Sequence, residues 1–152
     1  MALSELVNLQ EEKSRIETEL EIQSFLQKMS YALDNGAKII FQEHRRIDTY
    51  REMRYTNAYT IATLFPDENP VEVLKNELKT LRKENYIRTV KDLKFPTRSE
   101  MREFGKVYSA QDVYIKIRAE LLSDAGGHMV FVMSFHFAMK AFDDNDFPYE
   151  RK

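Results

Sequence analysis

The stretch DVYIKIRAELLSDAGGHMVFVMSFHFA, residues 112–138, holds two apolar segments on either side of a glycine-containing turn sequence. In the first segment Val113, Ile115 and Ile117 alternate with polar residues, which is the period-two pattern of a β-strand with one buried face. The second segment is more apolar, and SDAGG between them is typical of a turn. The stretch therefore predicts a β-hairpin.

Period two also predicts which side chains of this hairpin share a face, because a slip of one residue would expose one apolar set. In the second strand we expect the larger apolar side chains to face the core: Met129, Phe131, Met133, Phe135 and Phe137. The opposite face then carries Val130, Val132, Ser134 and His136. A three-residue loop, DAG or AGG, keeps this parity. Tyr114 is predicted opposite His136 or one diagonal step away, with Lys116 and Arg118 on the same face.

These polar residues suit the cleavage of a phosphodiester bond. A base must take the proton of the 2′-hydroxyl, an acid must protonate the leaving oxygen, and cations must stabilise the transition state. His136 has an ordinary pKa near neutrality, and Tyr114 can donate or accept a proton. Lys116 and Arg118 can hold the phosphate. The plainer alternative is an antiparallel sheet with an ordinary solvent-facing polar side.

The N-terminal part of the chain is predicted to be helical. Residues 2–36 carry apolar side chains at helical spacing, with Ser4 and Asn35-Gly36 as caps. A single helix of that length is unusual in a globular domain, so we expect a break between Glu19 and Ser24 or an exposed first half. Residues 1–22 are therefore predicted to form an acidic leader helix, protruding or frayed.

The remaining elements follow in a consistent order. AKIIFQE at 37–43 is a predicted strand, Thr56 or Asn57 can cap a short helix through Leu64, and Pro70 opens an amphipathic helix. Strands are predicted in NYIRTVKDLKF at 85–95 and EMREFGKVY at 100–108. Helices come first and an antiparallel meander follows, so residues 1–152 are expected to form a single α+β domain with helices packed on one face of the sheet.

Composition narrows the function classes. There is no apolar run near eighteen residues and no leader with a cleavage signal, so we expect a cytoplasmic protein without a membrane partner. The chain has no cysteine and only three histidines, which are scattered. No disulfide, metal site or cofactor is therefore expected.

Charge is unevenly distributed, although the net charge is only -2. Residues 79–118 contain eleven Lys/Arg against five Asp/Glu, whereas residues 1–34 contain three against seven. Clustered cations are compatible with a polyanionic partner, and a solvated basic surface is the alternative. The candidate RNA-binding residues are Lys94, Arg98, Arg102, Lys106, Arg118 and Ser134.

Four segments together resemble the later part of a known family. They are VEVLKNELKTLRKENYIRTV (71–90), EMREFGKVY (100–108), DVYIKI (112–117) and FVMSFHFA (131–138). In order and spacing, over about residues 70–140, they resemble MqsR-type toxins, the mRNA interferases of bacterial toxin-antitoxin systems. The resemblance implies a RelE-like, barnase-related ribonuclease fold.

The resemblance also implies metal-independent cleavage of single-stranded mRNA and inhibition by a cognate antitoxin protein. Tyr114 falls on the family's catalytic tyrosine, Lys116 shares its strand, and His136 occupies the SFH position. The family's upstream catalytic lysine and glutamine have no secure counterpart. The nearby candidates are Lys91, Lys94, Arg98, Arg102 and Lys106.

The expected function is accordingly a toxin-like endoribonuclease with Tyr114, His136 and Lys116 as catalytic residues. Its expected partners are single-stranded RNA and an antitoxin, with a homodimer left open. The alternatives are a non-catalytic RNA- or protein-binding module of the same fold, or a small structural or phage-derived protein.

Overall fold

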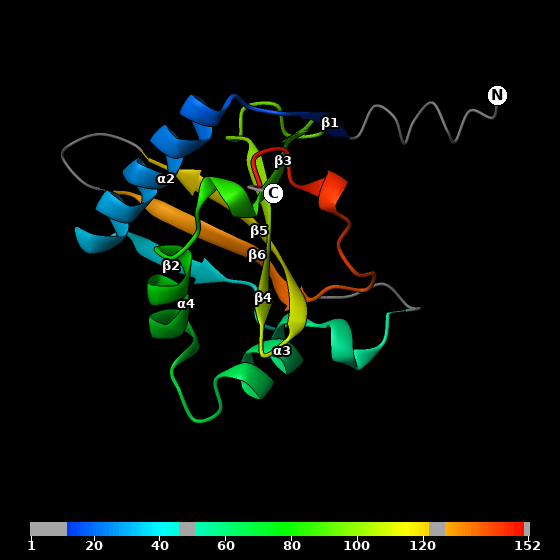
Figure 1. Cartoon of the computed structure of the whole chain (residues 1–152). Helices are drawn as coiled ribbons and strands as arrows, with labels where there is room; N and C mark the ends of the chain where they lie inside the picture. The colour runs from blue at the N-terminus through cyan, green and yellow to red at the C-terminus, as the bar shows by residue number, and fades with distance from the viewer. Residues whose placement is uncertain (1–11, 46–50, 122–126, 151–152) are drawn as a thin grey trace.

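The computed structural model describes residues 12–45, 51–121 and 127–150 (Figure 1). Within these ranges the chain has an α+β fold, as predicted, with three α-helices and one six-stranded, mostly antiparallel sheet. No helix in the described part of the chain is long and apolar enough to cross a membrane. The predictions for residues 1–11 and for most of the SDAGG turn lie outside the described residues.

The sheet has six strands in the described residues: β1 Glu12–Arg15, β2 Lys38–Phe41, β3 Tyr86–Asp92, β4 Met101–Tyr108, β5 Gln111–Glu120 and β6 Met129–Phe137. Their order across the sheet is β1-β3-β4-β5-β6-β2. All neighbouring strands are antiparallel except β2, which pairs with β6 in parallel and so departs from a simple meander. Strands β2 to β6 correspond to predicted segments, whereas β1 does not.

Local sequence signals set the helix starts. The helices are α2 Glu19–Asp34, α3 Asn57–Leu64 and α4 Pro70–Leu78. The Thr56 hydroxyl accepts a hydrogen bond from a backbone N–H in the first turn of α3, and Pro70 lies in the first turn of α4, as predicted. Helix α2 starts with a capping box in which Thr18 and Glu21 satisfy each other's backbone N–H groups.

The predicted leader helix is wrong for residues 12–22 as a continuous element. Residues 12–15 form strand β1 on β3, and the helix begins only at Glu19. The apolar residues that suggested a helix here are not buried, since Ile16 is 54% and Leu20 76% exposed. Pairing with the edge of β3 and the capping box at Thr18 therefore outweigh the weak helical periodicity of this segment.

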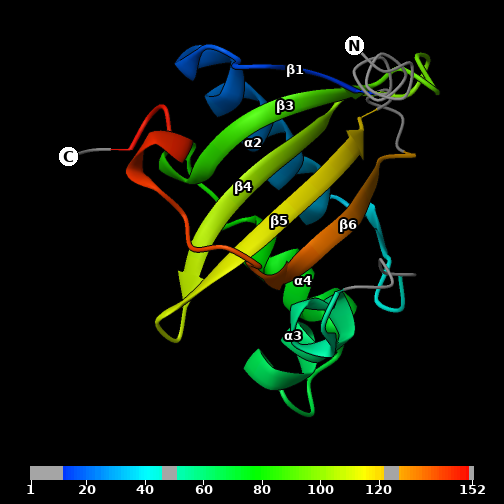
Figure 2. The ribbon, with the colours of Figure 1, turned by 90° about the vertical axis from the view of Figure 1, so that its right-hand side faces the viewer.

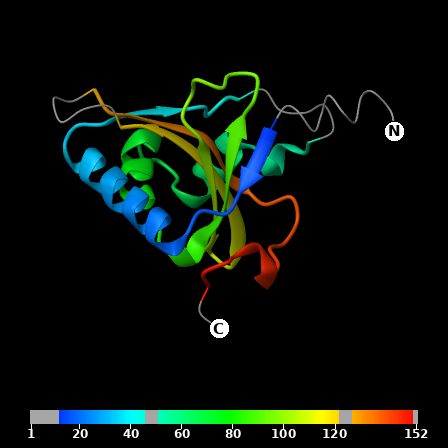
Figure 3. The same cartoon turned by 90° about the horizontal axis from the view of Figure 1, so that it is seen from above.

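One hydrophobic core joins the three helices to one face of the sheet. It includes Ile22 and Phe25 of α2, Ile61 of α3, Leu74 of α4 and buried residues of β3 to β6. Figure 2 shows α2 and α4 behind the sheet, and Figure 3 shows both on the same side of the strands. We call this side the helix face. The other side, which the segment after β6 crosses in Figure 2, is the open face.

A β-bulge in β6 changes which of its side chains face the core. Lys116 pairs with Ser134, but Ile117 pairs with Val132, so Met133 is an extra residue. The side chains of β6 that face the core are Val130, Val132, Phe135 and Phe137. The prediction is therefore correct for Phe135 and Phe137, and wrong for Met129, Phe131, Met133, Val130 and Val132.

Asn57, at the start of α3, holds the bulged part of β6. Its side chain is 5% exposed and accepts a hydrogen bond from the Phe135 N–H at 2.9 Å. Its amide donates to the carbonyl oxygens of Met133 at 3.0 Å and Gln42 at 2.8 Å. Strand β2 ends at Phe41, so Asn57 replaces the missing strand as the hydrogen-bond partner of β6.

Thr60 continues this role one turn further along α3. Its hydroxyl accepts a hydrogen bond from the Phe137 N–H at 2.9 Å. The backbone groups on both sides of His136 are thus fixed by buried side chains of α3, which holds the His136 side chain on the open face.

A second buried network joins both ends of the described chain to the helix face. Glu17 is 3% exposed and receives two hydrogen bonds from Arg102, at 2.7 and 3.0 Å, and one from Thr89 at 2.5 Å. The Tyr86 hydroxyl accepts from the Glu17 N–H, and the Tyr149 hydroxyl donates to the Glu17 carbonyl. Hydrogen bonds of this kind offset the cost of burying the carboxylate.

Substitution of Asn57 tests the edge contact. Asn57→Ala leaves a buried N–H and two carbonyl groups without this partner, and we expect a loss of about 3 kcal/mol in the free energy of unfolding. The matched control is Asn69→Ala, which removes only the exposed cap of α4 and should cost about 1 kcal/mol. Urea unfolding measures both losses, and equal losses would contradict the role given to Asn57.

The pH dependence of stability tests the Glu17 network. Burial alone would raise the pKa of Glu17, but the hydrogen bonds and charge of Arg102, with Thr89 and Arg15, lower it overall below 4.5. A lowered pKa in the folded state stabilises the protein above pH 4.5, and this contribution is lost as the pH falls through the folded-state pKa. The free energy of unfolding of the parent should therefore exceed that of Glu17→Gln at pH 6, and the difference should shrink as the pH falls toward the acid limit of folding. Parallel stability curves would show that Glu17 does not contribute in this way.

Candidate functional site

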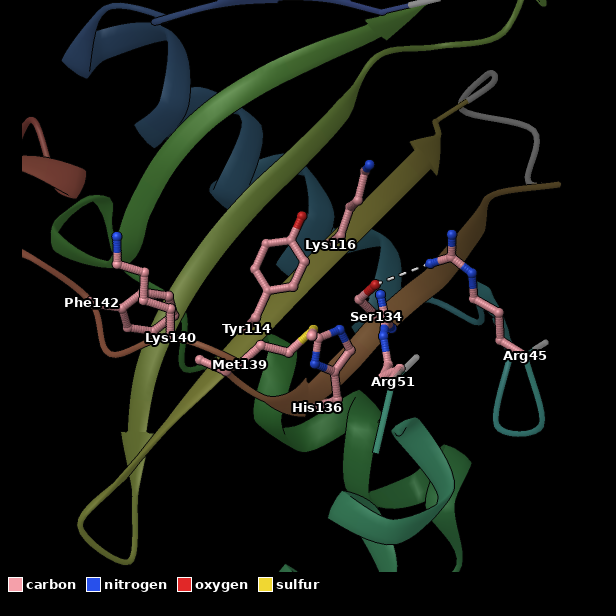
Figure 4. Close-up of a pocket in the computed structure, with 10 residues that line it drawn as sticks. Arg45, Arg51, Tyr114, Lys116, Ser134, His136, Met139, Lys140 and Phe142 are labelled. Carbon is pink, nitrogen blue, oxygen red and sulfur yellow. Dashed lines mark hydrogen bonds between the residues drawn. The ribbon is translucent and has the colours of Figure 1, made fainter. Parts of the chain in front are cut away.

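A pocket of about 330 Å³ opens on the open face of the sheet (Figure 4). It contains four of the residues predicted as catalytic or RNA-binding, Tyr114, Lys116, Ser134 and His136. The rest of its wall comes from outside β5 and β6. These residues are Arg45 and Arg51, which flank an undescribed segment, and Ala138, Met139, Lys140 and Phe142, which follow β6.

Tyr114 and His136 lie side by side at the floor of the pocket. They are direct register partners on β5 and β6, as predicted, and their ring centroids are 5.3 Å apart with the planes tilted by 53°. Figure 4 shows Met139 beside both rings. The two groups expected to move protons are therefore within reach of one bound group.

The hydrogen bonding of His136 fixes its tautomer. Its Nδ1 lies 2.9 Å from the Phe137 carbonyl oxygen, which can only accept, so Nδ1 carries the proton and Nε2 is the basic nitrogen. Burial lowers the pKa of His136, the bond to Phe137 opposes this, and the charges of Arg51 and Arg45 lower it further, to a net value below 6.5. The lowered pKa favours the neutral imidazole, whose Nε2 can accept a proton.

The pKa of Tyr114 is shifted in the opposite direction. Burial, and then the negative charge of Glu103 on β4, raise its pKa well above the ordinary value of 10. Arg88 on β3 opposes this only in part. The raised pKa favours the protonated phenol, which can donate a hydrogen bond.

Cationic groups surround the two rings. Arg45 donates from Nη1 to the Ser134 Oγ at 3.2 Å and to the Met133 carbonyl at 3.4 Å, as Figure 4 shows for Ser134. Lys116 Nζ lies 3.8 Å from the Glu12 carboxylate, a distance that leaves the lysine only loosely paired. With Arg51 and Lys140 these groups give the pocket a positive lining suited to an anion.

The segment after β6 closes one side of the pocket. The Phe142 N–H donates to Asp112 Oδ2 at 2.9 Å, and the Ala138 N–H donates to the Asp112 carbonyl at 2.9 Å. A Cβ at Gly105 would lie 2.6 Å from Phe142 Cε2 and 2.9 Å from Phe147 Cζ, so only glycine lets these rings reach β4. Gly105 is the register partner of Tyr114, which places Phe142 at the pocket wall.

Five of the predicted RNA-binding residues lie outside the pocket wall, and three of them are on the open face or in the connection between β3 and β4. Arg118 is on the open face, but its guanidinium stacks 4.0 Å above the Phe131 ring and pairs with Glu120 at 2.6 Å. Arg98 lies in the connection between β3 and β4, 3.9 Å above the Phe95 ring, and Lys94 is in the same connection. Arg98 and Arg118 line a separate, smaller cavity together with Met133 of β6, so they are not part of the pocket wall.

Arg102 and Lys106 lie on the helix face, away from the other candidates. Arg102 stacks 3.9 Å above Phe25 of α2 and is bound to Glu17, and Lys106 Nζ donates to the Thr80 hydroxyl. In β4 both residues point to the same side as the buried Phe104, so the period-two alternation of the sequence already indicated the helix face. The structure therefore does not bring these two candidates together with Tyr114 and His136.

The basic stretch at 79–118 is largely neutralised within the chain. Four of its cations pair with acidic residues of the first 34 positions, so the two oppositely charged segments meet each other. The pairs are Lys79–Asp34, Lys83–Glu19, Arg102–Glu17 and Lys116–Glu12. The excess of positive charge in this stretch is thus smaller than the sequence count indicates, and of its cations only Lys116 lines the pocket.

Sequence reasoning missed Arg45 and Arg51. The available signal was the basic sequence directly after the predicted strand at 37–43. Because β2 runs parallel to β6 and the Gln42 N–H donates to the Val132 carbonyl, the residues after β2 reach the Ser134 end of β6. Only the parallel pairing, which the sequence did not indicate, makes that basic sequence part of the pocket.

No group of three or more His, Asp or Glu side chains in the described ranges is arranged to hold a metal ion. Comparisons of the chain with family models, with curated proteins and with solved structures returned no match.

The titration of His136 tests the electrostatics of the pocket. We expect NMR to give a pKa below 6.5 for His136, and Arg45→Gln to raise that pKa because it removes a nearby positive charge. Lys28→Gln, a change on α2 behind the sheet, is the control. A value at or above 6.5 in the parent, or an equal response to both variants, would contradict the arrangement described.

Proposed function

We propose that the protein is a metal-independent endoribonuclease that cleaves single-stranded RNA at the pocket between Tyr114 and His136. The supporting observation is the placement of the His136 imidazole beside the Tyr114 phenol, 5.3 Å apart between ring centroids, inside a pocket lined by cationic side chains. A base, an acid and anion-binding groups are the parts that transfer of a phosphoryl group to a neighbouring hydroxyl requires.

In the proposed reaction, His136 Nε2 removes the proton of the ribose 2′-hydroxyl as O2′ bonds to phosphorus. The P–O5′ bond breaks and the leaving oxygen takes the proton of the Tyr114 hydroxyl. The products are a 2′,3′-cyclic phosphate and a 5′-hydroxyl end. Proton return from the His136 imidazolium to the Tyr114 phenolate, through solvent, restores the site.

The cations have a separate role in this proposal. Arg45 and Lys116 are placed to stabilise the extra negative charge on the non-bridging phosphoryl oxygens, with Ser134 as an additional hydroxyl donor. Arg45 contributes a planar guanidinium that can contact two phosphate oxygens. Arg118 and Arg98, which lie beside the pocket, are candidates for contacts with flanking nucleotides.

The biological context is part of the same proposal and rests on the sequence resemblance to MqsR-type mRNA interferases. It comprises a RelE-like version of the α+β fold, toxin activity against single-stranded mRNA in the cytoplasm and neutralisation by an antitoxin protein, with a homodimer left open. The geometry of the pocket is compatible with this context and is independent of it.

Cleavage of RNA by the purified protein in the presence of a chelator tests the proposal. We expect His136→Gln and Tyr114→Phe each to lower the cleavage rate about 100-fold or more, because each removes a proton-transfer group. Gel analysis of a single-stranded RNA with defined ends measures the rate. Growth arrest on expression should be relieved by the same two changes.

Lys106→Ala is the matched control for these variants. It removes a cation of the same basic stretch that lies on the helix face, and it should leave cleavage within about twofold of the parent. Cleavage that persists in both His136→Gln and Tyr114→Phe would reject the site. RNA that binds but is never cut would instead support the non-catalytic binding module.

A further inference from the structure

Glu103 on β4 is a buried carboxylate that the proposed reaction leaves without a role. It is 4% exposed, and its Oε1 accepts a hydrogen bond from Arg88 Nε at 3.0 Å. Its Oε2 is buried, and no donor of the described residues reaches it with full hydrogen-bond geometry. A buried carboxylate oxygen without a hydrogen-bond partner lowers the stability of the fold, so such a group is a candidate for a functional role.

The strand register places this oxygen next to the pocket. Glu103 is the direct partner of Lys116, and Gly105 is the direct partner of Tyr114, so Glu103 and Tyr114 are diagonal neighbours on the open face. Gly105 has no side chain to separate them. In Figure 4 the Tyr114 hydroxyl points away from Met139, toward the Lys116 end of the strand. That end is where Glu103 lies on the adjacent strand.

Among the described residues, no other charged group near Tyr114 is a buried carboxylate that could take the place of Glu103. The groups that face Tyr114 are Glu12 on β1, Arg88 on β3, Glu103 on β4, Lys116 on β5, His136 on β6, and Arg45, Arg51 and Lys140 at the pocket wall. Glu103 is the most buried of the carboxylates, since the Glu12 side chain is 51% exposed and lies against Lys116.

We propose that Glu103 is a positioning residue for Tyr114, with its buried carboxylate orienting the phenol and keeping it protonated until a leaving group is present. This inference deepens the proposed function and rests on it for its catalytic meaning. Arg88 holds Glu103 in place from the far side. When the Tyr114 proton passes to O5′, the phenolate is left beside a second negative charge, which favours rapid return of the proton from His136.

The coupling is measured directly, without RNA, by placing 3,5-difluorotyrosine at position 114. Its phenol is more acidic than that of tyrosine, so its ionisation is observed by absorbance at moderate pH in the folded protein. We expect Glu103→Gln to lower this phenol's pKa by about one unit or more, because the substitution removes a nearby negative charge but keeps the shape of the side chain. Arg88→Met removes the opposing positive charge and should move the pKa upward.

Glu100→Gln is the control, since Glu100 is bound to Arg15 and away from the pocket, and it should leave the phenol's titration unchanged. In the natural protein, the alkaline limb of the pH–rate profile for RNA cleavage should move to lower pH in Glu103→Gln, in step with the titration. Should Glu103→Gln fail to fold, the upward shift in Arg88→Met still tests the coupling.

The two proposals fail in different ways. If the phenol's pKa shifts as expected in a protein that cuts no RNA, the Glu103–Tyr114 coupling stands and the ribonuclease function is overturned. RNA cleavage by the parent, with the phenol's pKa unmoved in both Glu103→Gln and Arg88→Met, would overturn the role of Glu103 and leave the ribonuclease function standing.

Discussion

The hydrogen bonds from α3 to the edge of β6 are the constraint on which the open face depends. Strand β2 pairs with β6 only as far as Val132, and beyond that point Asn57 and Thr60 supply the partners that a strand would otherwise provide. Because side chains of α3 take the place of a paired strand here, β6 can form the bulge at Met133. The bulge keeps the valines and phenylalanines of β6 in one core. It also leaves His136 on a strand whose backbone is fixed on both sides, so its ring keeps a defined position beside Tyr114.

Charge is organised by the fold rather than by the local sequence. The acidic N-terminal segment neutralises much of the basic stretch through pairs such as Arg102–Glu17 and Lys79–Asp34. The cations that line the pocket come from other places, mainly the residues after β2. A protein with a small net negative charge thereby presents a concentrated positive pocket, which suits recognition of one phosphate more than a broad electrostatic grip on RNA.

Much of the fold and the centre of the pocket could be predicted from the sequence, because alternation in two strands is a strong local signal. Alternation placed Tyr114 opposite His136 or one diagonal step away, and the structure shows them as direct partners. The bulge could not be predicted, since it depends on Asn57, which is 76 residues from Met133 in the chain. Strand β1, the parallel β2 and the positions of Arg45 and Arg51 depend in the same way on distant contacts. Arg102 and Lys106 are different, because their parity with Phe104 already indicated the helix face.

The chemistry of the RNA ends gives the most direct test of the account. Phosphorus NMR of the products should show a 2′,3′-cyclic phosphate and no terminal 5′-phosphate, since the proposed reaction transfers the phosphoryl group to the 2′-hydroxyl. A substrate with 2′-deoxyribose at the scissile position should remain intact for the same reason. Cleavage of that deoxy substrate, or products that carry a 5′-phosphate, would contradict the central claim.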